Sequence, residues 1–262
     1  MDKKYTFSVF TKPWKLPLPE LAQFVRKMGY EGIEYPVRPG YEVNPENVSR
    51  KLPEAARIMA DHGIKITSIS GPTDEATFAA CAEAGIPFNR VMAFIGDVPY
   101  MQREAELIKE YSALVPLLER YGVKLAIQNH CDRFVANAMG LRHLLERLDT
   151  RYIRAVWDAA HNALNGEDPE MGIDIVWEFL CMVFLKNAFW IRVTGPEAED
   201  VAWRPYWTSA RQGLASFPRV AAELKKRNYE GVICITAEYT DEAAVERLAT
   251  EDLQYVKRLF LG

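Results

Sequence analysis

The feature of this sequence that most constrains its fold is a regular alternation of short apolar runs with longer amphipathic segments. Eight runs have strand character, and each is followed by a helical pattern, so that the unit recurs about every 25 to 35 residues. These runs read YTFSVF, GIEYP, IKITSIS, NRVMAFIG, VKLAIQNH, IRAVWD, FWIRVTG and GVICITAEY. Repeated strand and helix units build a parallel sheet covered by helices, so we predict an α/β fold.

The helical segments and their ends favour a closed barrel. Several helices end in Gly just before the next strand, as in KMGYEG, DHGIK and RYGVK, which suits a left-handed residue at a helix stop. We expect helices near residues 18–28, 46–61, 102–121, 137–148, 169–185, 217–227 and 241–259, and a short one in DEATFAACAEAG. Eight units over 262 residues predict a (β/α)₈ TIM barrel that forms a single domain, 1–262. An open doubly wound sheet is the alternative, but no G-x-G-x-x-G follows the first strand.

Charge and composition exclude some classes of binding partner. The net charge is −4 and no basic stripe is present, which argues against nucleic acid as a partner. The start, MDKKYTFSVFTKPWKL, lacks the apolar segment of a signal peptide. The apolar run 171–185 is interrupted by Asp174 and Glu178 and is too short for a membrane span. We therefore expect a cytoplasmic protein with no membrane partner, four reduced cysteines, and a buried helix over 171–185 that favours a homodimer or homotetramer.

Strand alternation predicts which side chains point into the barrel. Where one parity is apolar, as with Leu125 and Ile127, the other parity faces inward. The inward side chains are then Glu34, Lys124, Ala126, Gln128, His130, Val156, Asp158, Trp190, Arg192, Thr194, Cys234, Thr236 and Glu238. Burying so many ionisable groups is costly unless they are paired or bind a ligand. Because barrel enzymes build their active sites at the C-terminal mouth, we expect the functional site there.

Three segments together resemble a known superfamily. GVKLAIQNH is similar to a strand that ends in Glu-Asn-His, and WDAAHNALNGEDP is similar to Asp-x-x-His followed by a Gly-x-Asp-Pro turn. YEGVICITAEY is similar to a last strand that ends in a metal-binding Glu. Over nearly the whole chain, the sequence resembles the xylose isomerase-like TIM barrels, which comprise sugar and sugar-phosphate isomerases, ketose 3-epimerases and, more distantly, endonuclease IV.

The resemblance implies a site and a chemistry. It implies a divalent metal ion, Mn²⁺ or Mg²⁺, with Asp158, Glu238 and the amide oxygen of Gln128 as ligands. It also implies that Glu238 and His161 are catalytic and that Glu34 contacts a sugar hydroxyl. In that family the metal polarises a carbonyl while carboxylates move a proton at the adjacent carbon. We therefore expect an isomerase or epimerase that acts on a small-molecule carbohydrate, a keto-sugar or a polyol by enolisation.

Two positions depart from the family pattern. Gln128 stands where the family has a glutamate that is both ligand and base, and an amide cannot accept a proton at neutral pH. The family's seventh strand supplies a histidine in a His-x-Lys-Asp-like pattern, where the predicted strand here carries Trp190 and Arg192. Since His62 and His143 fall on predicted helices, few histidines remain for a site. A weak metal site, or none, is therefore an alternative.

Other residues have open roles. We expect His130, Trp190 and Trp14 to contact substrate along with Gln128, and Arg192 to hold a carboxylate or phosphate. A supporting or loop position is the alternative for His130, and a purely structural role is the alternative for Gln128. An ion pair between Arg192 and Glu238 is the alternative for those two residues. A loop capped by Asp158, with His161 only packing, is the alternative for the WDAAH turn. Trp14, Trp203, Tyr206 and Trp207 form either a sugar-stacking wall or a subunit interface.

The missing glutamate bears on the reaction class. An epimerase must add and remove a proton on opposite faces, whereas one base is enough for an isomerisation or a β-elimination. A keto-sugar lyase or dehydratase of the same fold is therefore one alternative. A barrel that has lost its metal and binds a sugar without turnover is another. DNA repair in the manner of endonuclease IV needs a site with many histidines, and this chain has only four.

Overall fold

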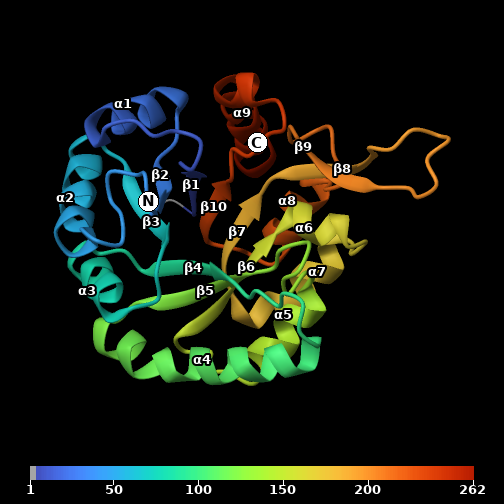
Figure 1. Cartoon of the computed structure of the whole chain (residues 1–262). Coiled ribbons are helices and arrows are strands. Elements are labelled where there is room, and N and C mark those ends of the chain that lie inside the picture. Colours follow the sequence, from blue (N-terminus) through green and yellow to red (C-terminus); the bar gives the residue numbers. More distant parts are fainter. Residues whose placement is uncertain (1–3) are drawn as a thin grey trace.

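Eight parallel strands close into a barrel at the centre of the molecule, in the order β1-β10-β7-β6-β5-β4-β3-β2 (Figure 1). The computed structural model describes residues 4–262. The barrel strands are β1 (Tyr5–Phe10), β2 (Gly32–Pro36), β3 (Lys65–Ser70), β4 (Phe88–Met92), β5 (Lys124–Gln128), β6 (Ile153–Asp158), β7 (Leu180–Leu185) and β10 (Gly231–Ile235). The predicted (β/α)₈ TIM barrel is confirmed.

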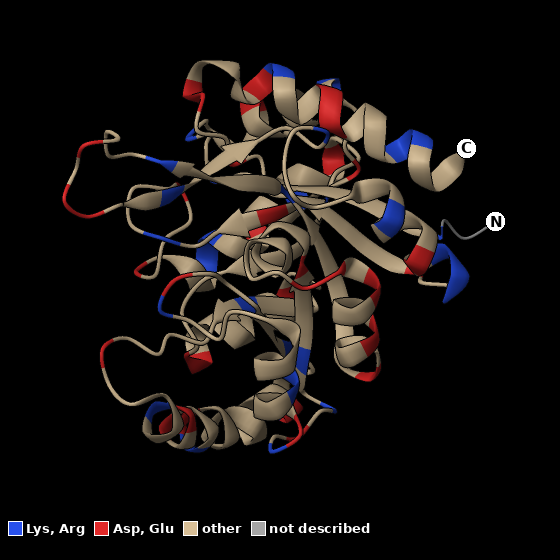
Figure 2. Ribbon diagram, turned by 90° about the vertical axis from the view of Figure 1, so that its right-hand side faces the viewer, with Lys and Arg blue, Asp and Glu red and all other residues tan. Residues whose placement is uncertain are grey.

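Helices surround this barrel on the outside (Figure 1). They are α1 (Leu18–Met28), α2 (Val48–Asp61), α3 (Glu75–Glu83), α4 (Tyr100–Tyr121), α5 (Ala138–Leu145), α6 (Ala159–Leu164), α7 (Pro169–Val176), α8 (Phe217–Lys226) and α9 (Val245–Leu261), with short 3₁₀ turns η1 (Trp177–Phe179) and η2 (Glu242–Ala244). Lys and Arg are interspersed with Asp and Glu along these outer helices (Figure 2).

The predicted glycine stops are confirmed. Gly29 after α1 and Gly122 after α4 have φ values of 95° and 64°, and their N–H groups bond to carbonyls of the last helical turn. Glycine adopts this left-handed conformation at little cost because it has no Cβ. Each stop turns the chain directly into the next barrel strand.

The side chains along each strand alternate between two apolar layers, as predicted. Outward residues such as Leu125 and Ile127 belong to the large core between the sheet and the helices. Inward residues fill the barrel itself and are Phe10, Ala126, Val156, Met182, Phe184 and Cys234. Because apolar side chains fill the barrel interior, the polar groups gather above them at the mouth.

The seventh barrel strand differs from the prediction. Residues 180–185, expected in a helix over 169–185, form β7, and the helix α7 ends at Val176. A strand buried on both faces is continuously apolar, and periodicity alone does not distinguish it from a buried helix. Since the barrel itself buries this run, the run no longer indicates a subunit interface. Within residues 4–262, no helix is long and apolar enough to cross a membrane.

The run expected as the seventh strand lies outside the barrel. It forms β8 (Asn187–Arg192), which pairs antiparallel with β9 (Trp203–Thr208) in a hairpin that projects from the barrel (Figure 1). The rings of Phe189 and Tyr206 stack across this pair at 5.2 Å. Pro205 is tolerated in β9 because a two-stranded ribbon leaves one edge without a partner strand. Trp203, Tyr206 and Trp207 therefore lie on a strand and not in a loop.

Candidate functional site

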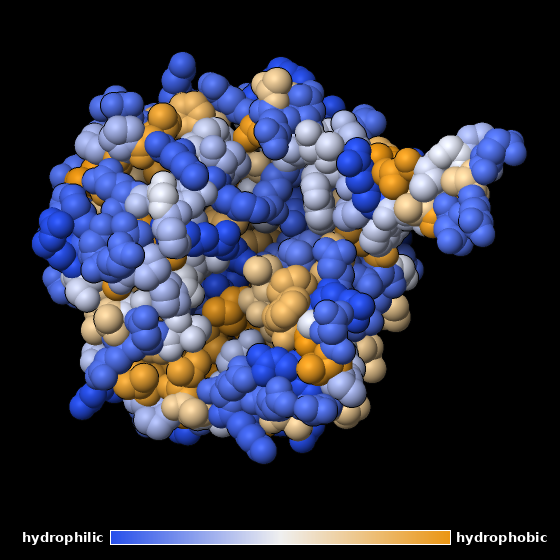
Figure 3. Space-filling model, viewed as in Figure 1, coloured by the Kyte–Doolittle hydropathy of each residue, from blue (hydrophilic) through white to orange (hydrophobic). Residues whose placement is uncertain are grey.

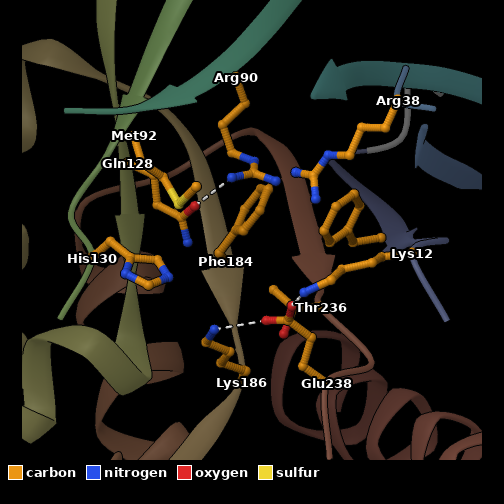
Figure 4. A pocket seen from close by; sticks show the side chains of 11 residues that line it. Lys12, Arg38, Arg90, Met92, Gln128, His130, Phe184, Lys186, Thr236 and Glu238 are labelled. Carbon is orange, nitrogen blue, oxygen red and sulfur yellow. Dashed lines mark hydrogen bonds and ion pairs between the residues drawn. The ribbon is translucent and has the colours of Figure 1, made fainter. Parts of the chain in front are cut away.

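The strand ends bring charged and polar groups into one cavity at the mouth. Figure 3 shows this face hollowed near its centre, with hydrophilic residues inside. The inner cavity has a volume of about 70 Å³ and is drawn in Figure 4. It is lined by Phe10, Lys12, Arg38, Arg90, Met92, Gln128, His130, Phe184, Lys186, Thr236 and Glu238. An outer groove of about 790 Å³ shares four of these residues and continues along Trp14, Tyr41 and Trp207. A small charged cavity thus opens into a wider aromatic groove.

A chain of hydrogen bonds crosses the floor of the cavity from β3 to β6. Glu34 accepts hydrogen bonds from Ser68 Oγ at 2.9 Å and from Arg90 Nε at 2.7 Å. Arg90 Nη1 donates to Gln128 Oε1 at 2.7 Å, and Gln128 Nε2 donates to Asp158 Oδ2 at 2.7 Å. All five side chains are buried. Because each of these acceptors already has a donor, the network holds the floor in one arrangement.

Asp158 caps the helix that follows its strand. Its Oδ1 accepts the backbone N–H groups of Ala160 and His161 at 3.0 and 3.1 Å, which begins α6. Burial raises the pKa of Asp158, while Lys186, the capping N–H and Gln128 lower it, and the net shift is upward. The WDAAH turn therefore has the capped-loop geometry.

Glu238 lies between two lysines. Its Oε1 is 2.5 Å from Lys12 Nζ and its Oε2 is 2.8 Å from Lys186 Nζ, as drawn in Figure 4. Burial alone would raise the pKa of Glu238, but Lys186 and Lys12 hold it well below its usual range. Burial would lower the pKa of Lys186, but Glu238 and Asp158 raise it instead. Glu238 is therefore a carboxylate and Lys186 an ammonium ion throughout the neutral range.

The backbone next to Glu238 is strained. Ala237 has a φ of 52°, in the left-handed region that residues with a Cβ rarely adopt. Strain of this kind is held in place by the surrounding structure and clusters at functional sites. Here the turn follows the last barrel strand and directs Glu238 to the two lysines.

Two histidine rings contact each other beside Lys186, tilted by 36°. The ring centroids of His130 and His161 are 3.9 Å apart, and His130 lines the cavity while His161 lies fully buried behind it. His130 Nδ1 is 2.9 Å from the carbonyl of Cys131, which only accepts, so the ring carries its proton on Nδ1 and a lone pair on Nε2. Burial lowers the pKa of both rings, and Lys186 lowers them further. Both imidazoles are therefore neutral near pH 7.

His161 has the opposite tautomer. Its Nδ1 accepts the backbone N–H of Cys131 at 3.1 Å, so the proton is on Nε2. Within residues 4–262, Nε2 has no hydrogen-bond partner, and Asp158 Oδ2 lies 3.9 Å away. The ring also meets the edge of Trp207 at 5.4 Å between centroids. His161 thus positions the His130 ring from behind.

The expected metal ligands do not fit a hard divalent cation. The oxygens of Glu238 bind two ammonium groups, and the amide oxygen of Gln128 binds Arg90. With β7 corrected, the pattern His-x-Lys-Asp corresponds to Phe184, Leu185, Lys186 and Asn187, so phenylalanine stands in the histidine position. Hard cations need several free oxygen ligands. Lys186 instead supplies a positive charge at this place.

A second group of residues has ligand atoms close together. His130, Cys131 and His161 offer ligand atoms within 4.8 Å of one another. Burial raises the pKa of the Cys131 thiol to about 12, and His161 Nδ1 already accepts a backbone N–H. Metal binding needs a thiolate and free ring nitrogens, so this cluster does not fit a metal either.

The structure gathers most of the residues that the sequence singled out. Gln128, His130 and Glu238 line the inner cavity, Glu34, Asp158 and His161 lie directly behind it, and Trp14 lines the outer groove. Lys124, at the start of β5, is exposed at the opposite end of the strand.

The inward placement of Trp190, Arg192 and Thr194 is wrong. Trp190 is on the hairpin, where its indole N–H donates to the carbonyl of Leu164. Arg192 donates to the carbonyl of Gly195 and forms no ion pair with Glu238. These residues lie outside the barrel because their strand pairs with β9 and not with β6 or β10.

Four basic residues of the site were missed. Lys186 directly follows β7, so its role was hidden when the apolar run before it was read as a helix. Arg90 belongs to the run NRVMAFIG, in which strand alternation puts Arg90 and Met92 on the face opposite Val91 and could have found it. Lys12 and Arg38 follow the ends of β1 and β2, and the rule that barrel sites form from such loops could have found them.

Comparison with known proteins gives the following matches. The family model described as xylose isomerase-like TIM barrel matches residues 22–259. No curated protein matches the chain. Among solved structures, the probable 3-DHS dehydratase AsbF from Bacillus anthracis has a TM-score of 0.75 at 14% identity, covering 96% of this chain and 98% of that one. D-psicose 3-epimerase from Clostridium cellulolyticum H10 has a TM-score of 0.73 at 11% identity, covering 97% and 99%.

A third solved structure is that of 3-keto-D-glucoside 4-epimerase, YcjR, from E. coli. Its TM-score is 0.71 at 13% identity, and the match covers 97% of this chain and 100% of that chain. At these identities, the likeness to all three structures shows the fold alone.

Proposed function

The chain belongs to the xylose isomerase-like TIM barrel family, and from that premise we propose that it is an enzyme that isomerises or epimerises a sugar, keto-sugar or polyol by enolisation. The observation that carries the proposal is a fixed ammonium ion and a neutral imidazole that line the same cavity. Lys186 and His130 both line the inner cavity and the outer groove (Figure 4).

The two groups suit the two halves of an enolisation. With the substrate carbonyl oxygen at Lys186, the ammonium ion donates a hydrogen bond to it. His130 Nε2 then takes the proton from the adjacent carbon. The electrons of the broken C–H bond form the C=C bond of the enol, and the carbonyl electrons move to the oxygen. The negative charge that develops there is stabilised by Lys186.

Proton return completes the reaction. For an isomer, the enolate oxygen takes the proton of the hydroxyl group on the deprotonated carbon, and the protonated His130 gives its proton to the former carbonyl carbon, so that the carbonyl group moves by one carbon. For an epimer, His130 gives its proton back to the other face of the original carbon after rearrangement of the substrate. His130 starts neutral because burial lowers its pKa, so it is able to accept a proton at pH 7.

The remaining predicted site residues take supporting roles in this proposal. Glu238 has too low a pKa to be an efficient base, and it holds Lys186 in place. His161 packs against the His130 ring, and Glu34 and Gln128 hold Arg90 at the cavity. The Mn²⁺ or Mg²⁺ ion expected from the resemblance has no role, because its oxygen ligands are committed to other partners. A homo-oligomer stays a prediction.

A dehydratase or lyase that acts on a keto-sugar is the second candidate. The observation that favours it is that Glu238 is held as an ion pair, which leaves His130 as the single neutral base among the residues lining the cavity. After the same proton abstraction, the enolate expels a hydroxyl group β to the carbonyl, and the protonated His130 gives its proton to that hydroxyl group, so that a conjugated enone and water form.

Hydrogen exchange tests both candidates. A panel of ketoses and keto-sugars is incubated with the enzyme in D₂O with a chelator, and NMR follows deuterium entry at the carbon next to the carbonyl. We expect exchange that the chelator does not affect, and a loss of about 100-fold or more in His130→Gln and Lys186→Met. An ultraviolet enone band marks the lyase. Exchange abolished by the chelator, or retained in His130→Gln, would refute the proposed mechanism.

A further inference from the structure

Arg38 is a cation without an acidic partner at the cavity. It follows β2, lines the inner cavity and is half-buried. Its Nη2 donates to Ser70 Oγ at 2.8 Å, and none of the carboxylates in residues 4–262 forms an ion pair with it. Burial and the nearby Arg90 lower its pKa, although it stays charged. A half-buried guanidinium without a counter-ion is unfavourable unless a ligand supplies one.

The other three cations of the cavity face three carboxylates. Arg90 is paired with Glu34 at 2.6 Å, Lys12 and Lys186 share Glu238, and Asp158 adds a negative charge near Lys186. The guanidinium carbons of Arg38 and Arg90 lie 5.6 and 5.0 Å from the centroid of the same Phe10 ring. Figure 4 shows the two guanidinium groups pointing toward each other. Their mutual repulsion is an added reason for an anion between them.

We propose that Arg38 binds a carboxylate group of the substrate, so that the substrate is a sugar acid, such as a uronate or a keto-acid sugar, and not a neutral sugar. The inference rests on the proposed function for the reaction and names its substrate class. A carboxylate fits the planar fork of a guanidinium through two parallel hydrogen bonds. Its single charge matches one uncompensated cation, whereas a phosphate near −2 would leave a negative charge unpaired.

The position of Arg38 agrees with this role. In Figure 4, Arg38 and Lys12 approach the cavity from the side opposite His130. A carboxylate held at Arg38 therefore orients the chain of the sugar across the cavity toward Lys186 and His130. The aromatic groove beyond, with Trp14 and Trp207, then covers the rest of the sugar.

Binding experiments test the subsite without any need for turnover. Isothermal titration calorimetry compares D-glucuronate and D-galacturonate with D-glucose, D-galactose and the two sugar 6-phosphates, and a thermal-shift series uses acetate at high concentration. We expect the uronates to bind at least about 10-fold more tightly than the matched neutral sugars and the phosphates. Arg38→Gln should lose this preference, by about 10- to 100-fold, and should bind neutral sugars as before.

Two further variants sharpen the result. Arg38→Lys keeps the charge but not the fork and should bind uronates with intermediate affinity. Arg192→Gln, an exposed arginine on the hairpin, should bind like the unmodified protein. The inference is overturned if neutral sugars or phosphates bind as tightly as uronates, if Arg38→Gln keeps the preference, or if no carboxylate binds. Uronate binding without hydrogen exchange would refute the proposed reaction and leave the subsite in place.

Discussion

The ion pair between Glu238 and Lys186 gives a quantitative test of the charge arrangement. Glu238→Gln keeps the shape of the side chain but removes the charge that compensates Lys186, which is 5% exposed, and Lys12, which is 46% exposed. Breaking a buried pair by removing one partner costs about 3–5 kcal/mol. Because Glu238 is 25% exposed and Asp158 still faces Lys186, we expect a loss of about 2–3 kcal/mol in the free energy of unfolding at pH 7.

The stability that Glu238→Gln loses should depend on pH. The pKa of Glu238 in the folded protein is lowered from its ordinary value of 4.5, so its contribution is present above about pH 4.5 and is lost as the pH falls toward the folded pKa. The difference in unfolding free energy between the two proteins should therefore be constant from pH 6 to 8 and shrink below about pH 4.5. Near neutral pH it corresponds to a melting temperature lower by about 5 °C.

Urea unfolding at several pH values, followed by circular dichroism, measures this difference. Glu230→Gln, at an exposed glutamate just before β10, is the matched control and should change stability by less than about 0.5 kcal/mol. If Glu238→Gln is as stable as the control at pH 7, or if its deficit persists unchanged at pH 3, the ion-pair reasoning is wrong.

Three further predictions concern the metal, a buried acid and the strained turn. Mass spectrometry of protein purified without chelator should find no stoichiometric Mn²⁺ or Mg²⁺, and neither ion should raise the melting temperature; a stoichiometric ion that disappears in Asp158→Asn would contradict this. Burial raises the pKa of Asp252 from 3.8 to about 6, so its proton stabilises the fold at low pH, and this stabilisation is lost as the pH rises through about 4 to 6. Relative to Asp252→Asn, the unmodified protein should therefore lose up to about 3 kcal/mol in its free energy of unfolding between pH 4 and 7, measured by denaturant titration. If the difference between the two proteins does not change with pH, the raised pKa of Asp252 is wrong. Ala237→Gly should stabilise the fold by up to about 1 kcal/mol because it removes the cost of a Cβ at positive φ. An unchanged melting temperature in thermal unfolding would contradict the strain at this residue.

The fold and the inner faces of most strands were predictable from local patterns. Alternation in VKLAIQNH and IRAVWD correctly gave Ala126 and Val156 as inward residues, and the glycine stops marked helix ends. These features depend on periods of 2 and 3.6 residues and on backbone conformations, which are properties of neighbouring residues. The sequence also sufficed to direct attention to Gln128, Asp158 and Glu238 at the barrel mouth.

The partners of these groups were decided only by the tertiary structure. A continuous apolar run such as 180–185 is compatible with a buried helix or a buried strand, and only closure of the barrel between β6 and β10 selected the strand. Because residues 180–185 form a barrel strand, Trp190 and Arg192 lie outside the barrel, and Lys186 contacts Glu238, which lies 52 residues further along the chain. By itself, the sequence determined the barrel and the kinds of residue at its mouth. Which charges meet there, and which one remains uncompensated at Arg38, depends on contacts between distant segments that local periodicity does not encode.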